Sequence, residues 1–295
     1  MVFSGYPLVM HEMCSIGPLT AGPDQPLLVI AGPCVLETVE TNNLIASTLK
    51  GLCEELGLPL VFKASFDKAN RSSIHSRRGP GLERGLAELV RIRNEFDLPI
   101  LTDVHAPEQA GPVGDAVDAL QIPAFLCRQT DLLLACAKTC KAVNVKKGQF
   151  MSPAEMIHVV NKLKEGGSKN IMLTERGTFF GYHRLVNDFL GLGDLMDIGP
   201  PVCFDVTHST QLPGGDRETS GGRPDRARLL ARAAVASGVH ALFIETHPEP
   251  EAAFSDASTV QPLHDMRELL EEIVAIRQAI FPARQSAQKA PLSGR

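Results

Sequence analysis

A repeated alternation of short apolar runs and longer helical stretches constrains the fold of this chain more than any other feature. The runs are rich in Val, Ile, Leu and Phe, and each is followed by a polar or glycine-containing turn. Near-continuous apolar strands that alternate with helices are typical of a parallel sheet covered by helices. The predicted strands are residues 27–31, 59–63, 99–103, 119–122, 142–146, 170–174, 201–206 and 241–245.

The helical pattern completes most of these units. The predicted helices are residues 38–56, 82–95, 131–141, 153–165, 225–237 and 262–280, with a short helix at 107–117 and a poorly marked one around 185–192. Eight strand–helix units in roughly 250 residues match a closed (β/α)8 barrel. The alternative is an open, doubly wound sheet, which normally carries a glycine-rich dinucleotide turn after its first strand. The first strand here ends in Ala31-Gly32-Pro33-Cys34 instead, so we expect an α/β protein with a (β/α)8 TIM barrel.

The segments that flank the repeats lack this pattern. Residues 1–26 are rich in Pro and Gly and mildly apolar, which favours an N-terminal cap or short hairpin. The barrel domain is expected over residues 27–282. The tail at 283–295 is polar and aperiodic, so we expect it to be disordered.

Composition narrows the class of partner and compartment. With 44% hydrophobic and 21% charged residues and a net charge of -5, the chain fits a globular protein without a nucleic-acid or membrane partner. No apolar run reaches the length of a membrane span. The N-terminal stretch contains His11 and Glu12 and does not resemble a signal peptide. Seven cysteines without framework spacing indicate free thiols and a cytoplasmic location.

A cluster of cations and hydrogen-bonding side chains follows the second predicted strand. Within residues 62–73 it contains Lys63, Ser65, Asp67, Lys68, Asn70, Arg71, Ser72 and Ser73. Lysine supplies a point charge and arginine a fork that can grip two phosphate oxygens. The cluster predicts an anion site, and a solvated basic loop is the alternative.

Polar or reactive side chains follow every predicted strand. They are Cys34, Lys63 with Ser65, Asp103 with His105, Gln121, Lys146 with Lys147, Arg176, His208 and Glu245. In a barrel these positions share one rim, where the chemistry is placed. Five cations would meet there, namely Lys63, Lys68, Lys146, Lys147 and Arg176. Because they would repel one another without an anion, we expect a phosphorylated substrate. His105 is either a site residue or a structural one.

A second group of side chains suits a divalent metal. Cys34, His208 and Glu245 leave strands one, seven and eight, which become neighbours when the barrel closes, and Asp256 follows strand eight. Thiolate, imidazole and carboxylate ligands suit Zn, Fe, Mn or Co. Their spacing is no local metal motif, so a packed cysteine and a structural histidine remain the alternative.

Several of these segments together resemble one enzyme family. They are 63–73 (KASFDKANRSS), 121–126 (QIPAFL), 146–150 (KKGQF), 174–177 (TERG) and 204–208 (FDVTH). In them the chain resembles the 3-deoxy-D-manno-octulosonate 8-phosphate synthases, over residues 27 to 281. The resemblance implies a homotetrameric barrel enzyme of lipopolysaccharide synthesis. Its reaction would be the condensation of phosphoenolpyruvate with arabinose 5-phosphate, releasing inorganic phosphate.

The resemblance also assigns substrate residues. Phosphoenolpyruvate would lie among Lys63, Ser65, Lys68, Gln121, Ala124, Lys146 and Arg176. Arabinose 5-phosphate would meet Lys68 and Asn70, with its phosphate held by Arg71 and Ser72 of a neighbouring subunit. Lys68, Asn70 and His208 would be the catalytic residues, with Lys68 as the proton donor to the developing alkoxide.

The family has a metal-dependent and a metal-free branch, and an asparagine replaces the strand-one cysteine in the metal-free branch. Cys34, together with His208, Glu245 and Asp256, resembles the metal-dependent branch, which implies a divalent Mn, Fe, Co or Zn. Three rivals stay open: a related synthase that uses erythrose 4-phosphate, a metal-free enzyme with a packed Cys34, and a barrel that binds phosphosugars without turnover.

Overall fold

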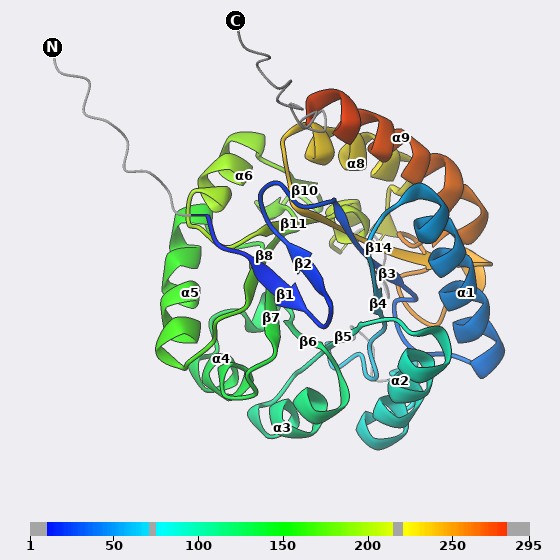
Figure 1. The fold of residues 1–295 in the computed structure, drawn as a ribbon, viewed down its shortest axis with the longest axis horizontal. Coiled ribbons are helices and arrows are strands. Elements are labelled where there is room, and N and C mark those ends of the chain that lie inside the picture. Colours follow the sequence, from blue (N-terminus) through cyan, green and yellow to red (C-terminus); the bar gives the residue numbers. More distant parts are fainter. Residues whose placement is uncertain (1–10, 71–74, 215–220, 282–295) are drawn as a thin grey trace, which may run out of the picture.

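Eight parallel strands close into a barrel in the computed structural model, which describes residues 11–70, 75–214 and 221–281. The barrel strands are β3 (Leu28–Gly32), β4 (Leu60–Lys63), β5 (Ile100–Asp103), β6 (Ala119–Ile122), β7 (Ala142–Lys146), β8 (Ile171–Glu175), β11 (Val202–Asp205) and β14 (Ala241–His247). Each pairs in parallel with the next, and β14 pairs with both β11 and β3, which closes the ring. The predicted (β/α)8 barrel is therefore confirmed (Figure 1).

Helices surround the barrel between successive strands (Figure 1). They are α1 (Val39–Leu56), α2 (Leu82–Phe96), α3 (Pro107–Ala116), α4 (Thr130–Ala137), α5 (Met156–Glu165), α6 (Phe189–Met196), α7 (Val206–Ser209), α8 (Ala227–Ala236) and α9 (Met266–Ile280). Short 3-10 turns are η1 (Ala124–Leu126), η2 (Pro153–Glu155), η3 (Pro224–Arg226), η4 (Pro250–Ala252) and η5 (Leu263–Asp265). Small strands outside the barrel wall are β1 (Cys14–Ile16), β2 (Leu19–Ala21), β9 (Thr178–Phe179), β10 (Leu185–Val186), β12 (Gln211–Leu212), β13 (Gly221–Gly222) and β15 (Gln261–Pro262).

Three predicted helices differ from the structure by about four residues at a boundary, each for a local reason. The helix expected to reach residue 141 ends at Ala137, because Cys140 has a φ of 59° that cannot continue a right-handed helix. The helix expected from 185 begins at Phe189, because residues 185–186 pair with β9 as a strand. The last helix begins at Met266 rather than 262, after the 3-10 turn η5.

Alternate residues of each barrel strand face two separate apolar cores. One set, which includes Val29 and Phe62, packs outward against the helices. The other set, which includes Ile30 and Phe243, packs inside the barrel. This division follows from the two-residue period of a strand.

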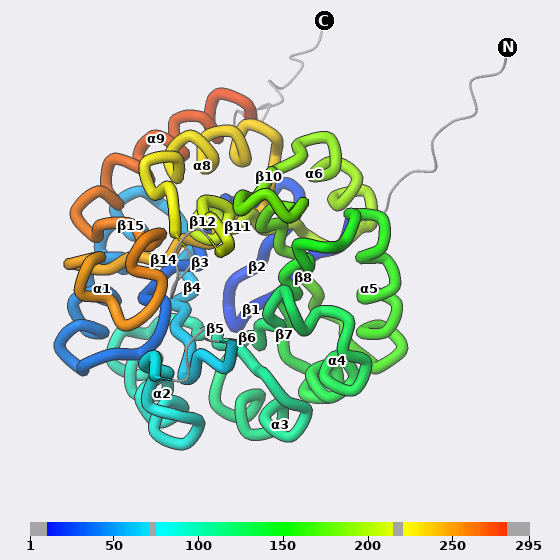
Figure 2. The backbone as a smooth tube through the Cα atoms, turned by 180° about the vertical axis from the view of Figure 1, so that it is seen from behind, coloured from blue at the N-terminus to red at the C-terminus, as the bar shows by residue number. Residues whose placement is uncertain are grey.

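The antiparallel β1–β2 hairpin covers one end of the barrel (Figure 1). Its Cys14, Ile16 and Ala21 join the inner core beside the first inward residues of the strands, such as Leu28. The hairpin therefore seals the amino-terminal end of the strands. Figure 2 shows the molecule from the opposite end, where β10, β12 and β15 lie. Within the part of the chain that the structure describes, no helix is both long and apolar enough to cross a membrane.

Candidate active site

A layer of buried polar side chains lies inside the barrel at the carboxyl ends of the strands. Along β7, for example, Ala142 belongs to the inner apolar core, and the next inward positions are Asn144 and Lys146. The equivalent residues around the barrel are Lys63, Asp103, Gln121, Asn144, Lys146, Thr174, Asp205 and Glu245, all of them buried. The apolar layer thus forms the floor of a polar chamber. The ring of Phe243 marks this floor, 3.7 Å from Nζ of Lys146.

Carboxylates neutralise most of the cations that the sequence places at this rim. Nζ of Lys63 lies 2.6 Å from Glu245 Oε1, and Nζ of Lys146 lies 2.7 Å from Asp205 Oδ2. The expectation that the cations repel one another unless an anion is bound was therefore wrong. Carboxylates at the strand ends already compensate the charge.

Lys147 does not join the other cations in the chamber. Its Nζ lies 3.5 Å from Glu175 and donates to the carbonyls of Gly148 and Met151. Successive residues of an extended chain point to opposite faces, so Lys147 leaves the strand on the side away from Lys146. Four rim cations remain after this pair is set aside, namely Lys63, Lys68, Lys146 and Arg176. Four carboxylates face them, namely Asp103, Asp205, Glu245 and Asp256.

Arg176 offers an unused donor to the chamber. The side chain is buried, and its Nη2 donates to Gln211 Oε1 at 2.6 Å. Its buried Nη1 has no hydrogen-bond partner among the residues that the structure describes. Burial also lowers the pKa of the guanidinium, although four nearby carboxylates act against this shift. A buried donor without a partner is costly, so this position favours an anionic ligand.

Lys68 lies half-buried beside the same carboxylates. Burial lowers the pKa of Lys68, but the nearby acidic groups of Cys34, Glu245, Asp103 and Asp256 outweigh burial and raise the pKa overall. Asn70 is exposed just beyond it. Arg71 and Ser72 lie outside the described residues. Ala124 is buried as the first residue of η1, where a backbone N–H has no partner within the turn.

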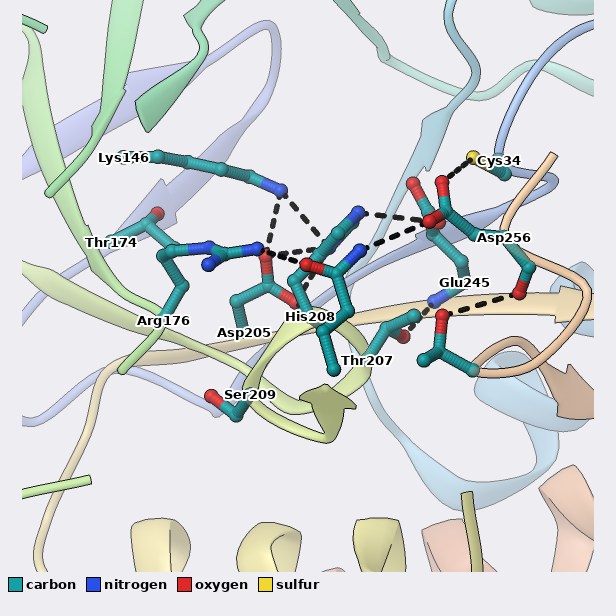
Figure 3. A network of polar contacts seen from close by, with 12 residues as sticks. Cys34, Lys146, Thr174, Arg176, Asp205, Thr207, His208, Ser209, Glu245 and Asp256 are labelled. Atoms are coloured by element: carbon teal, nitrogen blue, oxygen red, sulfur yellow. Dashed lines mark hydrogen bonds and ion pairs between the residues drawn. The ribbon is translucent and has the colours of Figure 1, made fainter. Parts of the chain in front are cut away.

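His208 lies in α7 and is held by Asp205, the last residue of the preceding strand β11. Asp205 ends β11 and caps α7 by accepting from the backbone N of His208 at 2.9 Å. The same carboxylate lies 2.9 Å from Nδ1 of His208, and Lys146 Nζ lies 3.4 Å from that nitrogen (Figure 3). The ring is thereby turned so that Nε2 lies 3.7 Å from Glu245 Oε2.

Cys34, Glu245 and Asp256 form a potential metal site. One ligand atom from each lies within 4.8 Å of the others, and the Cys34 thiol donates to Asp256 Oδ2 at 3.0 Å (Figure 3). Oε2 of Glu245 is buried without a hydrogen-bond partner in the described part of the chain. This open carboxylate oxygen, next to a thiol and a second carboxylate, fits a divalent cation. His208, the fourth expected ligand, is not in this cluster of three, and its Nε2 lies 3.7 Å from Glu245 Oε2.

The pKa of the thiol and the pKa of the carboxyl groups in this trio shift in opposite directions. Burial raises the pKa of the Cys34 thiol well above its usual value, and Asp256 and Glu245 raise it further. Burial also acts to raise the pKa of Glu245, but Lys63, His208 and Lys68 lower it to about 2. The trio is therefore a neutral thiol beside two carboxylates.

Local backbone geometry brings the trio together. A Cβ on Gly32 would lie 2.1 Å from the carbonyl oxygen of Lys63, so only glycine allows β3 and β4 to approach here. This closeness lets Lys63 Nζ donate to the Cys34 carbonyl at 2.9 Å. Asp256 adopts a left-handed φ of 52° and accepts from Ser255 Oγ at 2.9 Å.

His105 lies at the end of β5 beside the chamber. Its ring packs edge-on against Phe66, with centroids 5.7 Å apart. Its Nδ1 is buried without a partner among the described residues, and burial lowers its pKa.

Sequence reasoning missed several members of the chamber. Asp205 orients His208, Gln211 orients Arg176, and Asn144 and Thr174 connect to Gln121 through hydrogen bonds. The available signal was the polar residue in the middle of an apolar strand, as in Ala142-Val143-Asn144-Val145.

Comparisons with known proteins agree on one family. The family model described as DAHP synthetase I family matches residues 10–280. A protein from Desulfatibacillum aliphaticivorans is 50% identical over 92% of this chain and 99% of its own length. One from Desulfotalea psychrophila is 48% identical over 89% of this chain and 94% of its own length. One from a Synechococcus species is 51% identical over 86% of this chain and 90% of its own length. All three are named 2-dehydro-3-deoxyphosphooctonate aldolase.

Proposed function

The chain belongs to the DAHP synthetase I family and, within it, to the 2-dehydro-3-deoxyphosphooctonate aldolases, and we propose how its barrel mouth carries out the reaction of that enzyme. The enzyme condenses phosphoenolpyruvate with D-arabinose 5-phosphate and water. The products are 3-deoxy-D-manno-octulosonate 8-phosphate, the precursor of the lipopolysaccharide sugar, and inorganic phosphate.

Our placement of phosphoenolpyruvate rests on Nη1 of Arg176, which is buried and has no hydrogen-bond partner in the described part of the chain. Gln211 accepts from Nη2 and fixes the guanidinium, so Nη1 can bind an anion with little further loss of side-chain conformational entropy. Lys146 also points into the chamber and forms an ion pair with Asp205. Lys63, Ser65, Lys68, Gln121 and Ala124 complete the proposed phosphoenolpyruvate site.

The second substrate belongs on the open side of the chamber. Lys68 and the exposed Asn70 face that side in our proposal, and Arg71 and Ser72 of a neighbouring subunit in a homotetramer would hold the sugar phosphate. In the condensation, C3 of phosphoenolpyruvate bonds to the aldehyde carbon, water adds to C2, and phosphate leaves. The alkoxide that forms from the aldehyde takes a proton, and Lys68 is our candidate donor because its raised pKa keeps it protonated.

A divalent metal of the Mn, Fe, Co or Zn class fits the trio of Cys34, Glu245 and Asp256. The buried Glu245 Oε2, which has no hydrogen-bond partner within residues 11–70, 75–214 and 221–281, supports this assignment. The charge balance of the rim supports it as well. Four rim cations already face four rim carboxylates, so a metal cation would supply positive charge for two anionic substrates. When bound, such a metal supplies Lewis-acid polarisation of the aldehyde or of the attacking water. We propose His208 as its fourth ligand and as a contact of phosphoenolpyruvate.

We also propose a cytoplasmic location, since all seven cysteines are free thiols.

The rival reaction uses erythrose 4-phosphate as the acceptor, and membership of the DAHP synthetase I family makes it the main alternative. The two are separated by measuring phosphate release from phosphoenolpyruvate with each aldose phosphate. We expect turnover with arabinose 5-phosphate and less than a hundredth of that rate with erythrose 4-phosphate. Equal or greater turnover with the tetrose would overturn the substrate assignment.

A further inference from the structure

A chain of side-chain hydrogen bonds crosses five neighbouring strands of the chamber. Thr174 Oγ1 donates to Asn144 Oδ1 at 2.6 Å, and Asn144 Nδ2 donates to Gln121 Oε1 at 3.0 Å. Gln121 Nε2 then donates to one oxygen of Asp103, and Ser65 Oγ donates to the other oxygen. All five side chains are buried. We call this set the amide chain.

The direction of the amide chain is forced from its Asp103 end. Burial raises the pKa of Asp103, but Lys63, Lys68 and other cations lower it well below its usual range, so the group is a carboxylate that only accepts. Gln121 must therefore turn its Nε2 toward Asp103 and its Oε1 toward Asn144. Asn144 must therefore donate from its Nδ2 to Gln121 Oε1, which leaves Asn144 Oδ1 to accept from Thr174. One consistent arrangement results.

This arrangement decides what Ser65 and Gln121 can still offer. Ser65 uses its only hydroxyl proton on Asp103 and keeps only lone pairs, so its side chain cannot donate to an anion while this bond persists. Gln121 uses one of its two N–H bonds on Asp103 and keeps the other. Of these two neutral side chains, only Gln121 retains a donor for an anionic substrate.

We propose that Thr174 and Asn144 are positioning residues that hold the Gln121 amide so that its remaining N–H meets phosphoenolpyruvate. The inference rests on the proposed function, because it takes phosphoenolpyruvate as the ligand beside Gln121. Without the donation from Asn144, the amide loses the partner of its Oε1, and its orientation is no longer fixed. A well-oriented hydrogen bond to a charged ligand is then weakened, by about tenfold in affinity.

Binding of phosphoenolpyruvate alone, measured by titration calorimetry at matched metal content, tests this inference without requiring turnover. We expect Thr174→Val to weaken binding about tenfold, and Thr174→Ser to restore it because the hydroxyl returns. Thr102→Val is the matched control. Thr102 is equally buried, but its hydroxyl donates to the Ala64 carbonyl at 2.7 Å outside the amide chain. It should lower the melting temperature comparably and leave the affinity unchanged.

A double-mutant cycle then asks whether Thr174 acts through Gln121. In a Gln121→Ala background, Thr174→Val should weaken binding no further, since the amide that it positions is gone. Additive losses, or a loss equal to that of Thr102→Val, would overturn the positioning role. Wild-type protein that binds phosphoenolpyruvate but releases no phosphate with arabinose 5-phosphate would refute the proposed function alone. Wild-type protein that does not bind it would refute both.

Discussion

The ammonium group of Lys63 lies 2.6 Å from Oε1 of Glu245, and both side chains are almost completely excluded from solvent. The two residues are far apart in the sequence, on β4 and β14, and the closed barrel brings them together across β3. Glu245 therefore serves two neighbours. One oxygen neutralises Lys63, and the other has no hydrogen-bond partner among the described residues, while Glu245 also belongs to the cluster with Cys34 and Asp256.

Breaking this buried pair should destabilise the barrel strongly. Lys63→Met leaves Glu245 uncompensated, and we expect it to lower the free energy of unfolding by about 3–5 kcal/mol. The double variant Lys63→Met/Glu245→Gln should recover much of that loss, because no lone charge stays buried. Urea unfolding of the metal-free proteins measures the double variant and both single variants, Lys63→Met and Glu245→Gln. A double variant that loses the sum of the two single losses would show that the pair is not coupled.

Cys34→Ala should abolish stoichiometric metal binding and leave the fold intact. The small side chain removes one donor of the trio, and the neighbouring carboxylates alone bind a borderline metal less tightly. Cys203→Ala is the matched control, since this thiol is equally buried inside the barrel and belongs to the apolar core. Metal analysis after gel filtration, with circular dichroism, gives the comparison. Full metal occupancy in the Cys34 variant would remove Cys34 from the ligand set.

Metal binding should release a proton and strengthen as the pH rises. Burial and the adjacent carboxylates raise the pKa of Cys34, so the thiol is protonated near neutral pH in the metal-free protein. A metal requires the thiolate, so affinity should rise by up to about tenfold per pH unit below that pKa. Calorimetry in buffers of different ionisation enthalpy counts the protons. We expect the wild type to release about one proton for each metal ion bound, and metal binding without proton release would argue against a thiolate ligand.

Arg176→Lys should weaken phosphoenolpyruvate selectively. The lysine keeps a positive charge but loses the fork that joins Gln211 to the free Nη1 position, so we expect KM for phosphoenolpyruvate to rise by about 10- to 100-fold. KM for arabinose 5-phosphate should change little. Arg71→Ala is the reciprocal variant and should affect mainly the sugar phosphate. Equal effects of either variant on both substrates would contradict the assigned positions.

The fold was predictable because each barrel strand is a nearly unbroken apolar run, and both faces of such a strand are buried. The rim residues were predictable by type, since polar side chains follow each run. The ion pairs and hydrogen bonds that these rim residues form with one another were not predictable. Closure alone places Lys63 beside Glu245, and the pairing of Lys147 with Glu175 depends on which face each residue takes at the end of its strand. Asn144 was hidden for a related reason, because a single polar residue in an apolar strand does not reveal its hydrogen-bond partners.

The most direct test of the account follows both substrates in one sample by phosphorus NMR. Phosphoenolpyruvate and arabinose 5-phosphate are mixed in equal amounts with the metal-loaded protein, and all phosphorus signals are integrated with time. We predict that one inorganic phosphate and one new sugar phosphate ester appear for each pair of substrates consumed. Release of phosphate without loss of the arabinose 5-phosphate signal, or no change in either substrate, would contradict the proposed condensation.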